Sequence, residues 1–211
     1  MSGQLVVTRH GESEYNAKGL WTGWTDVHLT QKGKNDAKKV AELIKGIQFS
    51  GIYVSPLIRT TETLDSFNEI LHLTAPVVSA PELRERNYGI YNGQDKWQVK
   101  EKVGEEEFQK IRRGYDYQPQ DGESLKMVVA RVVPYYREVI LPRLLAGENI
   151  LVVAHGNSDR ALIKYLENIS DENIAEREML LGTVLIYTVL DDGRMDTKTE
   201  LNADIGETAK A

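Results

Sequence analysis

Two histidines of this chain each follow directly on a short apolar segment. Residues 5–8 lead into Arg9 and His10, and residues 150–154 lead into His155. A neutral imidazole has a nucleophilic nitrogen that accepts phosphoryl groups, and an arginine beside it would pair with the phosphate oxygens. A lone histidine is more often a hydrogen-bonded structural residue, but the repeated context favours a shared site. We therefore predict phosphoryl-transfer chemistry with His10 as the acceptor.

The apolar segments before the two histidines must bring them together. Both segments are short and rich in β-branched residues, which is typical of buried strands. Ligands bind at the carboxyl ends of the strands in open α/β sheets. We therefore expect His10 and His155 in one cleft. The glycine after each histidine (Gly11 and Gly156) would let the backbone approach a ligand closely.

The rest of the chain alternates strands with helices. Further strands are predicted at 51–54, 77–78 and 184–187 and around Met195, the last two joined by a hairpin turn at 191–193. Helices are predicted from an N-cap at Thr30, around Arg59, over an exposed 95–113, over 124–144 with a break at Pro134, and over 158–166. This pattern predicts an α/β fold in which a mostly parallel sheet has helices on both faces. We expect a single domain over 1–211, with a mobile tail at about 202–211.

Charge and composition restrict the partners. The 211 residues carry a net charge of −6, which gives no overall attraction for nucleic acid or for an anionic membrane. There is no cysteine, and therefore no disulfide or thiol nucleophile. We find no signal peptide pattern and no apolar run near the roughly 20 residues that span a bilayer. A cytoplasmic protein is the expectation.

A metal site is another interpretation of two neighbouring histidines. Such a site would need further ligands, commonly carboxylates at helical spacing, and the sequence offers no such pattern. Arg9 beside His10 would also disfavour a cation. We therefore expect chemistry that needs no metal.

These motifs resemble a known family. Arg9-His10-Gly11-Glu12-Ser13, together with residues 155–158, resembles the histidine phosphatase superfamily. The closer resemblance is to the short form of its 2,3-bisphosphoglycerate-dependent phosphoglycerate mutase branch. It rests on segments at 21–24, 55–59, 83–89, 112–113 and 122–125. The matches cover nearly the whole chain.

The resemblance implies a role for each matching residue. It implies a three-layer histidine phosphatase-like fold in which His10 is phosphorylated and Glu85 exchanges protons with the substrate hydroxyl. The implied catalytic residues are Arg9, His10, Arg59, Glu85 and His155. The implied substrate-binding residues are Asn16, Thr22, Gly23, Tyr88, Lys96, Arg112, Arg113, Gly156 and Asn157.

The activity implied by the resemblance is that of an isomerase in glycolysis and gluconeogenesis. It would interconvert 3-phosphoglycerate and 2-phosphoglycerate, and 2,3-bisphosphoglycerate would prime it without a metal. The partner would be a small phosphorylated substrate. The interval between Arg113 and His155 is short compared with longer members, which carry a segment linked to subunit association. A monomer or a small homo-oligomer is therefore expected.

Two alternatives remain open at this point. A phosphatase would use the same His10 chemistry, but water would take the phosphoryl group from small phosphate esters. A non-catalytic module that binds a phosphorylated ligand is the more distant alternative, although it would need neither His10 nor Glu85. The chain also departs from related sequences at Asp159, where leucine is frequent.

Overall fold

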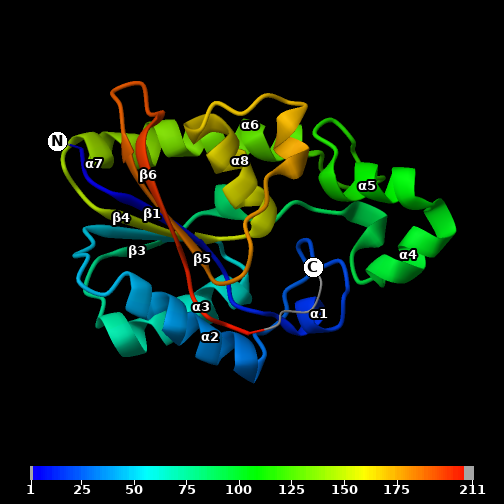
Figure 1. Cartoon of the computed structure of the whole chain (residues 1–211), viewed down its shortest axis with the longest axis horizontal. Helices are drawn as coiled ribbons and strands as arrows, with labels where there is room; N and C mark the ends of the chain where they lie inside the picture. Colours follow the sequence, from blue (N-terminus) through cyan, green and yellow to red (C-terminus); the bar gives the residue numbers. More distant parts are fainter. Residues whose placement is uncertain (1, 207–211) are drawn as a thin grey trace.

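The computed structural model describes residues 2–206, which form a six-stranded sheet with helices around it (Figure 1). The strand order across the sheet is β3 (Val77–Ser79), β2 (Gly51–Val54), β4 (Ile150–Ala154), β1 (Leu5–Arg9), β5 (Thr183–Val189) and β6 (Met195–Asn202). The first four strands in this order pair in parallel, while β5 and β6 form an antiparallel edge. The predicted mostly parallel sheet is confirmed.

Helices cover both faces of this sheet. One face is covered by α2 (Gln31–Leu43) and α3 (Ile58–Leu71), and the other by α6 (Leu125–Tyr135), α7 (Leu141–Leu145) and α8 (Gly156–Leu166) (Figure 1). Successive strand residues point to opposite faces, so Val6 joins the core under α2 and Val7 joins the core under α8. Every residue of β4 is buried, which explains its uninterrupted apolar sequence.

The pairing of β1 with β4 positions the two histidines. Arg9 lies opposite Ala154 in the parallel register, so both chains leave the sheet at the same edge. The backbone N–H of His10 then donates to the carbonyl oxygen of Ala154 over 3.0 Å. His10 and His155 follow these two positions directly. The sequence-based expectation that they meet at the carboxyl ends of two strands is correct.

The charged segment at 95–113 extends beyond the sheet. It forms two helices, α4 (Lys96–Val103) and α5 (Glu105–Arg113), separated at Gly104, whose φ is +81°. The prediction of an exposed segment is only half right. One face of each helix is buried against a third apolar cluster, which contains Val99, Phe108 and Ile111. This packing fixes the basic end of α5 over the cleft described below.

The long helical pattern is interrupted near Pro134, as predicted. Pro134 lies inside α6, and the chain then continues through a π-helical turn (Tyr136–Ile140) into α7. A proline has no N–H for the helix ladder, so a local change of winding is the expected response. The remaining short elements are α1 (Glu14–Ala17) and 3-10 turns at Pro81–Leu83, Gly89–Tyr91 and Asn173–Glu176.

The C-terminal tail begins later than predicted from the sequence. The tail is predicted from about residue 202, but Asn202 still belongs to β6. Ala203 donates to the Gly182 carbonyl over 2.9 Å, and the Lys32 ammonium donates to the Ile205 carbonyl over 3.0 Å. Residues 207–211 of the predicted tail lie outside the described residues. Within residues 2–206 no helix is long and apolar enough to cross a membrane.

Candidate active site

His10 follows β1 directly, and its ring is oriented by the next residue. Its Nδ1 lies 2.6 Å from the Gly11 carbonyl oxygen, which only accepts, so Nδ1 carries the proton and Nε2 keeps its lone pair. Burial, followed by the charges of Arg59 and Arg9, lowers the pKa of His10 well below its usual value. The imidazole is therefore neutral and nucleophilic at neutral pH.

The loop after His10 is fixed by the two helices beneath it. The Gly11 N–H donates to the Thr63 hydroxyl over 3.0 Å. A Cβ at Gly11 would collide with the carbonyl oxygen of Gly33 in α2. A Cβ at Gly156 would meet only ordinary contacts with Arg9. The glycine after His10 is therefore needed for packing against α2, which is a different reason from the predicted approach to a ligand.

His155 lies against the ring of His10 and is fully buried. The two rings meet edge to face, with centroids 5.0 Å apart and planes at 62°. Burial, with Arg59 as the next cause, lowers the pKa of His155 well below its usual value. Neither ring nitrogen has a hydrogen-bond partner among residues 2–206. Buried polar atoms are rarely left this way, so an anion on His10 would supply the missing acceptor.

Two arginines supply positive charge beside His10. Arg59 is fully buried at the start of α3 and donates to the carbonyl oxygens of Gly23 and Thr25 over 2.8 and 3.1 Å. Burial lowers the pKa of Arg59 to about 10, which still leaves it charged at neutral pH. Arg9 donates to the Met179 carbonyl over 3.2 Å. The Nε atoms of both arginines lack partners within the described part of the chain.

Glu85 is the acidic residue of the cleft. Its Oε1 accepts from the N–H of Arg86 over 2.8 Å, and from the backbone and side-chain nitrogens of Asn157 over 3.0 and 3.1 Å. The side chain is nearly buried, at 7% exposure. Three donors fix one oxygen, so the other oxygen is the one suited to exchange a proton with a ligand hydroxyl.

The loop that carries Glu85 is held by Arg131 of α6, a residue that was not predicted from the sequence. Its guanidinium donates to the carbonyl oxygens of Glu82, Arg84 and Glu85 over 2.5, 2.9 and 3.0 Å. The same group forms two 3.0 Å hydrogen bonds with the carboxylate of Glu123. A partly buried fork of this kind fixes three carbonyl groups within one four-residue stretch of the loop, and therefore the position of Glu85.

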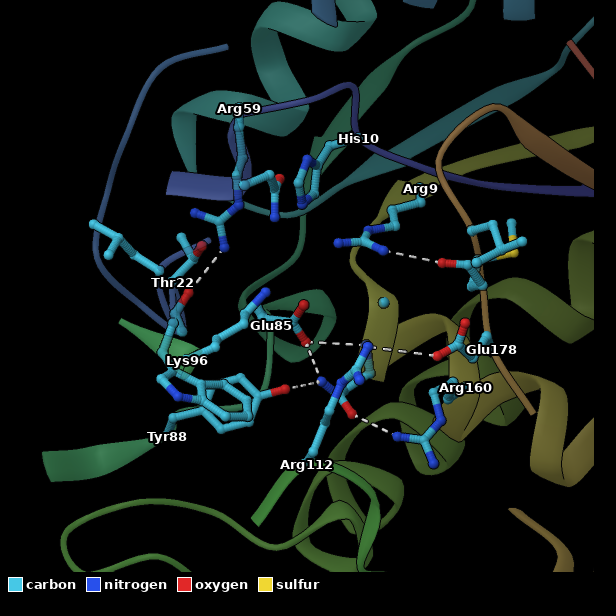
Figure 2. Close-up of a pocket in the computed structure, with 18 of the residues that line it drawn as sticks. Arg9, His10, Thr22, Arg59, Glu85, Tyr88, Lys96, Arg112, Arg160 and Glu178 are labelled. Atoms are coloured by element: carbon cyan, nitrogen blue, oxygen red, sulfur yellow. Dashed lines mark hydrogen bonds and ion pairs between the residues drawn. The ribbon is translucent and has the colours of Figure 1, made fainter. Parts of the chain in front are cut away.

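Most predicted site residues meet in one open cleft, whose empty space is roughly 710 Å³ with the adjoining solvent included. The described lining includes Arg9, His10, Asn16, Thr22, Gly23, Arg59, Glu85, Tyr88, Lys96, Arg112, Arg113, Gly156 and Asn157. His155 is the exception, because its ring is fully buried against that of His10 and is not part of this lining. Figure 2 shows His10 and Arg59 at one end, Arg112 at the other, and Glu85 between them.

Lys96 lies over the face of Trp21 without a carboxylate partner. Its ammonium is 5.7 Å from the ring centroid, and no ion pair of Lys96 is found among the described residues. Burial, with Arg9 and Arg112 as further causes, lowers the pKa of Lys96 to about 8. A buried ammonium beside like charges favours an anionic ligand, whose negative charge would raise the pKa of Lys96.

The far end of the cleft has two further charged residues, Arg160 and Glu178, that were not predicted from the sequence. Arg160 donates to the Asn157 side-chain oxygen over 2.9 Å and to the Ile174 carbonyl over 2.8 Å. Its spacing from Asn157 on α8 was a usable signal, since residues three apart share a helix face. Glu178 forms ion pairs with Arg112 and Arg113. No local pattern marks Glu178, which arrives from a distant loop.

Asp159 is buried in α8 without a partner. It is 1% exposed, and neither carboxyl oxygen has a hydrogen-bond partner within residues 2–206. Burial, with Glu85 as the next cause, raises the pKa of Asp159 well above its usual value. The folded protein therefore holds this carboxyl as the neutral acid over a pH range in which the unfolded chain ionises it.

We expect Asp159→Leu to stabilise the protein at neutral pH by about 1–3 kcal/mol, because it removes an unsatisfied buried group. The raised pKa means that wild-type stability falls as the pH rises above the unfolded value of about 4. The advantage of leucine should therefore be larger at pH 8 than at pH 4, which urea unfolding at both pH values measures. Asp159→Asn should lose the pH dependence and gain less stability. A less stable leucine variant would contradict this account.

Comparison with known proteins gives one consistent family. The model of branch 1 of the histidine phosphatase superfamily matches residues 5–200. A 2,3-bisphosphoglycerate-dependent phosphoglycerate mutase of Afipia carboxidovorans is 45% identical, over 93% of this chain and 97% of that protein. The protein of the same name from Corynebacterium kroppenstedtii is 42% identical, over 91% of this chain and 88% of its own.

Solved structures share the fold at lower identity. A mycobacterial glucosyl-3-phosphoglycerate phosphatase in complex with VO3 superposes with a TM-score of 0.82 at 26% identity, covering 96% of this chain and 100% of its own. The YhfR protein of Bacillus stearothermophilus gives a TM-score of 0.81 at 23% identity, covering 99% of both chains. The second likeness concerns the fold alone.

Proposed function

The chain belongs to branch 1 of the histidine phosphatase superfamily, and we propose that it is a 2,3-bisphosphoglycerate-dependent phosphoglycerate mutase. It interconverts 3-phosphoglycerate and 2-phosphoglycerate, a reaction of glycolysis and gluconeogenesis. We further propose that it acts in the cytoplasm on this small phosphorylated substrate, as a monomer or a small homo-oligomer. The names of its relatives at 40–45% identity support the activity.

One observation supports this function more than any other. A neutral His10, with Nε2 as the lone-pair atom, shares a cleft with Glu85 and with a separate basic end at Arg112 and Arg113. A ligand with a phosphate at one end and a carboxylate at the other fits this division of charge. A catalyst for simple phosphate release has less need for the second basic group.

The residues present fit a bisphosphorylated primer. The partnerless nitrogens of Arg9, Arg59 and His155 lie around His10. The Lys96 ammonium, which lies over the Trp21 ring, lines the same cleft. Bound there, 2,3-bisphosphoglycerate would supply the phosphoryl group that primes His10. The protein needs no metal in this proposal, because the arginines spread the charge of the transition state.

The transfer itself is assigned to two side chains. The bond between phosphorus and His10 Nε2 breaks as a substrate hydroxyl oxygen bonds to phosphorus, and the hydroxyl proton passes to Glu85. The phosphoryl group on the adjacent carbon of the resulting bisphosphoglycerate then returns to His10 by the reverse step. Nε2 bonds to phosphorus as the bond from phosphorus to the substrate oxygen breaks, and Glu85 returns the proton to that oxygen. Arg9, Arg59 and a neutral His155 hold the phosphoryl oxygens throughout.

We expect isomerisation of 3-phosphoglycerate to need added bisphosphoglycerate and to be unaffected by EDTA. Phosphorus NMR follows both phosphoglycerates and free phosphate in one sample, and it needs no metal-dependent coupling enzyme. A turnover that requires a divalent metal and ignores the bisphosphate would contradict the mechanism. Free phosphate appearing faster than the isomer would favour the phosphatase alternative.

A further inference from the structure

The basic end of the cleft contains an acid of the protein's own. Arg112 and Arg113 form the last turn of α5, and both are in an ion pair with the carboxylate of Glu178. For Arg112 the nitrogen-to-oxygen distance is 3.8 Å. Figure 2 shows Glu178 reaching toward Arg112 beside Arg160, at the end of the cleft away from His10. The position proposed for the substrate carboxylate therefore already has a carboxylate.

Electrostatics explains why a carboxylate is attracted there. Burial, with Arg112 and Arg160 as the next causes, lowers the pKa of Arg113 to about 10. Burial also lowers the pKa of Arg160 to about 10. Crowded cations of this kind repel one another, so a negative charge between them is favourable. Glu178 supplies this charge as long as no ligand does.

The backbone around Glu178 is anchored on both sides, while its side chain is not enclosed. Arg177 is held by ion pairs with Glu167 and Glu200 at 3.6 and 3.4 Å. Met179 is buried, and its carbonyl accepts from Arg9. The Glu178 side chain between them is 37% exposed. It therefore has room to rotate toward solvent without any movement of the loop.

We propose that Glu178 tunes the affinity for the substrate: it occupies the carboxylate position in the unliganded enzyme and is displaced by the carboxylate of the substrate. This inference deepens the proposed function and rests on it. A ligand with a phosphate alone leaves Glu178 in place, whereas a phosphorylated acid must exchange one ion pair for another. Glu178 thus lowers the affinity for phosphorylated acids, and it keeps substrate and product from binding too tightly.

Two ligands that cannot transfer a phosphoryl group allow the competition between Glu178 and a ligand carboxylate to be measured by binding alone. The ligand 3-phosphonopropionate carries a carboxylate, ethylphosphonate lacks it, and the carbon–phosphorus bond of both prevents transfer to His10. Calorimetric titration of Glu178→Gln should show 3-phosphonopropionate binding about two- to fivefold tighter than in the wild type, the range of a partly exposed ion pair. Ethylphosphonate should bind with unchanged affinity.

Glu176→Gln is the matched control. Glu176 is exposed, lies two positions away and forms no ion pair among residues 2–206, so removing its charge should change neither affinity. Unchanged or weaker binding of 3-phosphonopropionate by Glu178→Gln would overturn the proposal, and so would an equal gain for both ligands. Isomerase activity is measured separately. A failed mutase assay with an intact ligand contrast would therefore reject the proposed function and not the role of Glu178.

Discussion

His10→Ala should abolish both turnover and labelling of the protein by radiolabelled 2,3-bisphosphoglycerate. The variant has no nucleophile at the position where the arginines and His155 converge, so turnover should fall by more than about 10⁴-fold. The fold should survive, because the β1–β4 pairing and the two adjacent cores do not depend on the imidazole. Phosphorus NMR measures turnover, and acid-labile, base-stable label on the protein measures phosphorylation.

His28→Gln is the control for the His10 variant. His28 is 59% exposed at its side chain and is paired with Glu62 through Nδ1, well outside the cleft lining. This control should label and turn over like the wild type. Residual labelling of His10→Ala would mean that another residue, with His155 as the nearest, accepts the phosphoryl group. In that case the assignment of His10 as the phosphoryl acceptor would be wrong, although the membership of the family would stand.

The elements that carry the chemistry were predictable because their signals are local. An uninterrupted apolar segment followed by a histidine describes β4 and His155, and the N-cap predicted at Thr30 accepts from the Gly33 N–H as expected. The parallel register that unites the two histidines follows from the general behaviour of α/β sheets.

The parts that escaped prediction depend on contacts between distant segments. Arg131 is a helical arginine like any other in the sequence, yet in the structure it holds three carbonyl oxygens of the loop that carries Glu85. Glu178 reaches Arg113 from a loop more distant still, and no spacing rule connects the two. His155 was predicted to meet His10, but only the packing reveals that its ring is buried edge to face against His10 and does not line the cleft.

Asn157 shows how a local signal and a long-range contact combine at Glu85. Its backbone and side-chain nitrogens both hold Glu85 Oε1, and the same side-chain nitrogen donates to the Tyr88 hydroxyl over 2.8 Å. Arg160 in turn donates to the Asn157 oxygen. The carboxylate of Glu85 is therefore held by residues of α8, although Glu85 itself lies in a loop far from α8 in the sequence. This arrangement predicts that the geometry of Glu85 will tolerate loss of its charge.

Glu85→Gln should accordingly slow phosphoryl transfer by about 10²–10⁴-fold, while ligand binding stays close to that of the wild type. Glutamine has the same shape, and its oxygen still accepts from Asn157 and Arg86, but an amide cannot take the proton of a substrate hydroxyl. The effect should therefore fall on kcat and leave the affinity for 3-phosphonopropionate within about threefold.

Glu82→Gln provides the control for Glu85, because it removes a carboxylate three residues away that does not line the cleft. Only the backbone carbonyl of Glu82 is used by Arg131, so that variant should keep wild-type kcat. If Glu85→Gln also kept wild-type kcat, proton transfer would have to pass through another group, and the acid–base role of Glu85 would be wrong. A variant that lost ligand affinity and kcat together would instead indicate that Glu85 mainly organises Asn157 and Tyr88.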